Sequence, residues 1–85
     1  MVNAKRNATE RPPQVSSRLS ISEANLYDSS TTENPWQRLA KMAETVTHDL
    51  MSRVGYDRKI TVTIEPLPEH HPDFPGMQVY ARTRL

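Results

Sequence analysis

The sequence predicts an α+β fold: an N-terminal arm without fixed structure, then one amphipathic helix and a two-stranded antiparallel β element. Three observations predict it. Residues 1–33 are polar, residues 34–54 carry apolar side chains at helical spacing, and residues 59–65 and 77–85 alternate between apolar and polar. We therefore divide the chain into the arm, residues 1–33, and a module of helix and β-hairpin, residues 34–85.

The composition predicts a marginal core. The chain has 85 residues, of which 35% are hydrophobic, and it contains one Trp, one Phe and three Tyr. Small chains bury a low fraction of their surface, so a core built from this material is weak. The net charge of +1 argues against a strong overall attraction to nucleic acid or to an anionic membrane.

Several classes of protein are excluded by what the sequence lacks. Without cysteine it has no disulfides, thiolate metal sites or cysteine nucleophiles. Its start does not resemble a secretory signal peptide, and no apolar run approaches the roughly 18 residues that span a bilayer. We expect a protein of the cytoplasm, or of a virion or other large assembly, with no membrane contact.

The arm has the composition of a disordered segment. It holds fifteen Ser, Thr, Asn, Gln or Pro residues against five Val, Ile or Leu. Such a segment buries too little apolar surface to offset the entropy lost when its backbone becomes ordered. We expect it to be disordered alone, or to become ordered on a partner.

One part of the arm, residues 19–27, is richer in apolar side chains. Ser20 and Glu23 have the spacing of a helical capping box, whereas Leu19 and Ile21 alternate with serines as in a strand, so helix and strand both stay open. One interpretation is a motif that binds a partner through Leu19, Ile21, Leu26 and Tyr27. The other is a segment that packs on its own domain or has no role.

Residues 34–54 have the clearest pattern in the chain. Asn34 suits the N-cap, Pro35 the first helical position, and Gln37 the third position of a capping box. Gly55 suits the C-terminal cap. Apolar residues recur in steps of three and four and form a narrow stripe, which we predict to be partner-binding: Trp36, Leu39, Ala43, Val46, Leu50 and Val54. Trp36→Asp should then disrupt folding or association, because it would bury an unpaired charge.

Two segments near the C-terminus have the period of β-strands. In residues 59–65, Ile60, Val62 and Ile64 point to one side. Residues 77–85 alternate in the same way, and a connection with four prolines separates the two segments. We predict that they pair as a wide antiparallel hairpin, with Tyr80 near Thr63.

A partner is expected because this fold is incomplete. Two strands alone are marginal in water, and both would be edges with free backbone donors and acceptors. The hairpin can pair with that of a second copy, the helix stripe can pack on another stripe, or the module can join a larger assembly. We therefore expect a protein partner or a homo-oligomer.

The sequence offers little for catalysis or metal binding. Glu69, His70, His71 and Asp73, with His48, are the only dense group of metal-capable side chains. We interpret them as a solvated loop, because adjacent histidines in a proline-rich segment point in different directions. Glu44 and His48 are four residues apart on the helix, where a surface contact is the simpler interpretation. We expect no enzyme activity, no metal, no cofactor and no small-molecule substrate.

One polar strand face has a composition typical of nucleic-acid binding. Tyr80, Arg82 and Arg84 would share the face of the hairpin that carries Thr61 and Thr63, with Arg58 and Lys59 at the start of the first strand. An aromatic ring among cations is the composition of a surface that binds single strands. It is also an ordinary solvated face whose charges discourage aggregation, and Asp57, Glu65 and Glu69 dilute it.

Three functional hypotheses follow. The first is a non-enzymatic structural or adaptor subunit that acts through protein–protein contacts, with the arm docking on a neighbour. The second is a nucleic-acid-binding regulator that uses the basic face of the hairpin. The third is an inhibitor, similar to an antitoxin, that binds another protein through its disordered arm.

Overall fold

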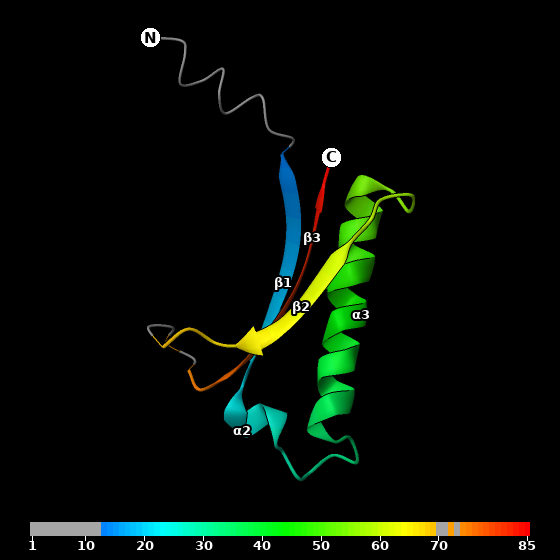
Figure 1. The fold of residues 1–85 in the computed structure, drawn as a ribbon. Helices are drawn as coiled ribbons and strands as arrows, with labels where there is room; N and C mark the ends of the chain where they lie inside the picture. The colour runs from blue at the N-terminus through cyan, green and yellow to red at the C-terminus, as the bar shows by residue number, and fades with distance from the viewer. Residues whose placement is uncertain (1–12, 70–71, 73) are drawn as a thin grey trace.

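The structure, a computed structural model, describes residues 13–69, 72 and 74–85. Its elements follow in the order β1 (Gln14–Ser22), α2 (Glu23–Leu26), α3 (Pro35–Val54), β2 (Thr61–Pro66) and β3 (Gly76–Arg84). The strands form one antiparallel sheet in the order β1-β3-β2, and α3 packs on one of its faces (Figure 1). The first twelve residues of the arm, and His70, His71 and Asp73, lie outside the described residues.

The mixed α+β class, the single long helix and the antiparallel pairing of β2 with β3 are confirmed. The two-stranded sheet is wrong, because residues 14–22 of the arm form a third strand. β1 pairs with the side of β3 that does not face β2. The pairing covers nine residues, from Gln14 opposite Arg84 to Ser22 opposite Gly76. Ordering these nine residues costs conformational entropy, and their composition suggested that nothing would offset this cost. The backbone hydrogen bonds to β3 offset it, together with the apolar side chains at alternate positions of β1.

Residues 19–27, for which helix and strand both stayed open, contain the end of a strand and a short helix. β1 continues to Ser22, and the short α2 then begins. The N-cap is Ser22, whose side chain accepts a hydrogen bond from the Asn25 N–H at 3.4 Å, and not Ser20 as the capping-box spacing had suggested. Leu26 at the end of α2 is buried, so this segment packs on its own domain.

The predicted limits of α3 are confirmed. Asn34 Oδ1 accepts from the Gln37 N–H at 2.8 Å, and Gln37 Oε1 accepts from the Asn34 N–H at 3.0 Å, which completes the capping box. Gly55 ends the helix with a φ of 104°, where a side chain would be strained, and its N–H donates to the Met51 carbonyl at 2.8 Å.

The core lies between α3 and the middle of the sheet. Leu39, Val46 and Leu50 of α3 pack with Leu26 and with two residues of the central strand, Val79 and Ala81. α3 lies over β3 and β1 and makes far fewer contacts with β2. Val62 and Ile64 of β2 consequently stay 39% and 38% exposed on the face that α3 covers, which we call the helix-side face.

An arginine ties the far end of α3 to β1. Arg53 Nη2 donates to the Ser16 carbonyl at 2.7 Å and to Asp49 Oδ2 at 3.0 Å. The helix therefore lies closer to the β1 edge of the sheet and covers β2 only in part. Within the described part of the chain, no helix combines the length and the apolar character needed to cross a membrane.

Candidate functional site

The face of the sheet opposite α3, here called the open face, gathers polar and basic side chains. Because Val79 and Ala81 point toward α3, their neighbours in β3 point away from it. Tyr80 therefore lies between Arg18 of β1 and Thr63 of β2, and Arg82 lies between Ser16 and Thr61. No element among the described residues packs over this face.

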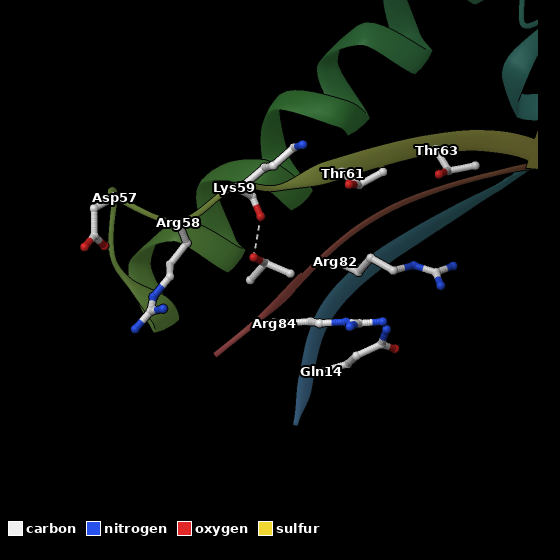
Figure 2. A pocket seen from close by; sticks show the side chains of 9 residues that line it. Gln14, Asp57, Arg58, Lys59, Thr61, Thr63, Arg82 and Arg84 are labelled. Carbon is white, nitrogen blue, oxygen red and sulfur yellow. Dashed lines mark hydrogen bonds between the residues drawn. The ribbon is translucent and has the colours of Figure 1, made fainter. Parts of the chain in front are cut away.

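Two shallow hollows adjoin on the open face. One, of about 600 Å³, lies where β3 ends beside the start of β1 and is lined by Arg82, Arg84 and Gln14, among others. The second, of about 730 Å³, is lined by Arg18, Tyr80 and Glu65, and it also includes Arg82 and Gln14. Figure 2 shows Arg82 and Arg84 extending from β3 in the same direction, with Gln14 beside Arg84.

Positive charge is concentrated here. The hollows are lined by five basic side chains and two carboxylates, namely Arg18, Arg58, Lys59, Arg82 and Arg84 with Asp57 and Glu65. Among the described residues, the ion pairs lie at α3 instead: Lys41 with Glu33, and Arg53 with Asp49 at 3.0 Å. The arginines of the open face therefore have no carboxylate within ion-pair distance in the part of the chain that the structure describes.

The centre of the open face is an arginine stacked on a tyrosine. The Arg82 guanidinium lies 4.7 Å from the centroid of the Tyr80 ring, close enough for a cation–π interaction. The Tyr80 hydroxyl donates to Glu65 Oε2 at 3.4 Å, and Gln78 Nε2 donates to Glu65 Oε1 at 2.8 Å. Glu65 stands opposite Gln78, six residues along β3 from Arg84, or roughly 20 Å. Its negative charge therefore lies beside Tyr80, on the side of the stack away from Arg84.

The structure brings together three of the five residues predicted for nucleic-acid binding. Tyr80, Arg82 and Arg84 share the open face, whereas Arg58 and Lys59 stand at the rim of one hollow and point away from them (Figure 2). Sequence reasoning missed Arg18 and Gln14. The polar alternation of Gln14, Ser16, Arg18 and Ser20 was the signal that could have revealed them.

Most residues predicted to bind a protein partner pack within the chain. Leu39, Val46, Leu50 and Leu26 are buried, and Ala43, Val54 and Ile21 pack half-buried against them. Trp36 and Tyr27 are 71% and 63% exposed, and Leu19 is 37% exposed. Of the residues predicted to bind a protein partner, only these three are more than a third exposed.

The residues weighed for catalysis and metal binding stay apart from the open face. Glu44 and His48 are exposed and line a hollow on α3 with Asp49. Among the residues that the structure describes, no three side chains of His, Asp or Glu gather as a metal site. His70, His71 and Asp73 lie outside this set, so the expected absence of a metal stays a prediction.

Comparison of the chain with protein-family models, with curated proteins and with solved structures found no match. A functional proposal therefore rests on the chemistry of the open face itself.

Proposed function

We propose that this protein is a non-enzymatic module that binds single-stranded nucleic acid on the open face of its sheet. The observation that carries the proposal is the Arg82–Tyr80 stack, flanked by Arg18 on one side and Arg84 on the other. Phosphates are attracted to unpaired cations, and unstacked bases pack on aromatic rings and on guanidinium planes. One sheet face offers both kinds of contact.

The shape of the site favours a single strand over a duplex. A sheet face with a stacking group at its centre needs bases that are free to turn toward it, and a duplex hides its bases within the stack. Three strands about 4.8 Å apart give a platform about 10 Å wide and roughly 20 Å long. This is space for a few nucleotides, with the backbone running along the arginines.

The near-zero net charge of the chain does not oppose this proposal, because attraction depends on the local field. The remaining basic residues of the described chain, Arg38, Lys41 and Arg53, lie on α3, where Lys41 pairs with Glu33 and Arg53 with Asp49. Charge is thus separated between the open face and the helix side. The expected weakness of overall attraction is compatible with binding on one face.

The adaptor and inhibitor hypotheses remain predictions with less support. The helix stripe expected to serve an adaptor contributes most of its side chains to the core. An inhibitory arm of residues 1–33 would have to release β1 from β3 or act through residues 1–12 alone. Neither hypothesis accounts for the unpaired arginines of the open face.

The electrostatic part of the proposal is tested by salt dependence. Neutralising three phosphates, through Arg18, Arg82 and Arg84, gives a slope of log K against log salt of about −2 for a single strand. Arg82→Ala with Arg84→Ala should flatten the slope by about 1.4, measured by fluorescence anisotropy with labelled oligo-dT and oligo-U. Lys41→Ala is the control, since it removes a positive charge from the helix side and should leave the slope unchanged.

The stacking part is tested at Tyr80. Tyr80→Leu should weaken binding about 5- to 150-fold, since a base–aromatic stack contributes roughly 1–3 kcal/mol, and should leave the salt slope unchanged. Tyr80→Phe keeps the ring and should bind nearly as the natural chain. Absent binding, or binding that ignores salt and both sets of substitutions, refutes the proposal.

A further inference from the structure

We propose that a second copy of this chain pairs with the outer edge of β2, antiparallel to it, about a two-fold axis at Thr63. β2 is an edge strand, because β3 is its only neighbour in the sheet. The other edge, β1, differs in two respects: α3 leans over it, and Arg53 occupies the Ser16 carbonyl. Among the described residues, the outer edge of β2 carries no such cover.

The direction of the backbone groups on β2 follows from one hydrogen bond. The Leu67 N–H donates to the Gly76 carbonyl at 3.1 Å, so Leu67 turns its backbone groups toward β3. Backbone groups alternate along an antiparallel strand, so Val62 and Ile64 turn theirs outward. Pro66 falls in the same outward set, where its missing N–H removes nothing from the sheet.

These outward groups match those of an identical strand. With Thr63 facing Thr63 of the second copy, Val62 stands opposite the second copy's Ile64, and each such pair exchanges two N–H···O=C bonds. The Ile60 N–H is then aligned with the Pro66 carbonyl of the other copy. In this register every outward N–H of β2 has a carbonyl acceptor, and Pro66, which has no N–H, serves only as an acceptor.

The side chains on this edge also match. Val62 and Ile64 are 39% and 38% exposed on the helix-side face, and across the axis they would cover each other. β-Branched cross-strand pairs of this kind stabilise antiparallel sheets. The gap that α3 leaves over β2 would thus be closed by a second β2.

Charge favours the antiparallel direction. Arg58 and Lys59, beside Asp57, come just before β2, while Glu65 lies near its end and Glu69 follows it. Antiparallel pairing sets the basic end of each copy beside the acidic end of the other, so this favourable contact occurs at both ends of the interface. A parallel arrangement would set like charges together, so the partner that complements this edge best is the same edge reversed.

The register is tested by a single cysteine, since the natural chain has none. Thr63→Cys at the axis would place two Cα atoms about 4.5 Å apart, as in a non-hydrogen-bonded pair, which a disulfide can bridge. Thr61→Cys is the matched control on the same strand face, with its two copies roughly 13 Å apart. Mild oxidation of the full chain should give a covalent dimer with Thr63→Cys and only single chains with Thr61→Cys.

The interface is tested by placing a charge at one of its apolar positions. Ile64→Lys places a charge in the seam, whereas Leu19→Lys places the same charge on β1, where Leu19 is equally exposed and also stands opposite Val79. Sedimentation equilibrium should give the mass of two chains for the natural protein and for Leu19→Lys, and a dissociation constant raised at least 100-fold for Ile64→Lys. Circular dichroism melts confirm that both variants fold.

A natural chain that sediments as one copy at 100 μM, or as more than two, overturns the proposal. Equal dissociation of both lysine variants, or equal cross-linking of both cysteine variants, also overturns it. The inference is independent of nucleic-acid binding: Ile64 lies on the helix-side face and leaves Tyr80, Arg82 and Arg84 in place. Failure of pairing therefore leaves the proposed function of the single chain intact.

Discussion

Trp36 and Leu39 are three residues apart on the same predicted stripe, yet substitution by aspartate should affect them very differently. Trp36 is 71% exposed at the start of α3, while Leu39 is 3% exposed in the core. Leu39→Asp should unfold the domain. Trp36→Asp, which the sequence pattern marked as disruptive, should leave it folded.

The magnitudes follow from burial. Full burial of a large apolar side chain is worth up to about 3 kcal/mol, so the buried third or less of Trp36 accounts for about 1 kcal/mol. The first turn of α3 holds no acidic residue in the natural chain. An aspartate there stabilises the helix by about 0.3–1 kcal/mol through the helix dipole, which offsets part of that loss. Leu39→Asp loses about 2–5 kcal/mol of packing and also buries a charge, which exceeds the roughly 3–5 kcal/mol that a domain of this size possesses.

Both variants can be measured by thermal melts followed by circular dichroism at 222 nm. Trp36→Asp should melt within about 5 °C of the natural chain, and Leu39→Asp should show no cooperative transition. A Trp36→Asp chain that is unfolded at 25 °C would mean that Trp36 is packed against something, and the assignment of this residue to the exposed surface would be refuted.

Two further substitutions test features of the fold. Asn34→Ala removes one half of the capping box and should lower the free energy of unfolding by about 1 kcal/mol in urea titrations, whereas Thr32→Ala just outside the helix should have no effect. Gly76→Ala would set a Cβ in steric overlap with the Ile21 carbonyl oxygen, so β1 must shift away from β3. We expect a loss of at least about 1–3 kcal/mol, against no change for the exposed Ser20→Ala; equal urea midpoints for these two would contradict the close approach of the strands.

The helix was predictable because its signals are local. Asn34, Pro35, Gln37 and Gly55 each act within one turn of their own position, and the stripe needs only the period of the helix. The pairing of β2 with β3 was predictable for a similar reason, since both strands alternate clearly. The alternation places Tyr80 and Thr63 on the same face, and the structure sets them opposite each other.

β1 was not predictable because its stability comes from elsewhere. Residues 14–22 contain Val15, Leu19 and Ile21 among serines, which is the composition of a disordered segment. They form a strand because β3, more than fifty residues later, offers a free edge. The candidate site could be predicted only in part for the same reason. Arg82 and Arg84 could be found from the pattern of β3 alone, whereas Arg18 belongs to the site only because β1 pairs with β3.

The guanidinium of Arg53 on the Ser16 carbonyl has a consequence for how far this protein can assemble. A sheet with two receptive sides adds copy after copy and grows into a fibre, whereas a sheet with one receptive side stops growing once that side is filled. By occupying an acceptor on β1, a single surface arginine helps to keep polymerisation from starting there.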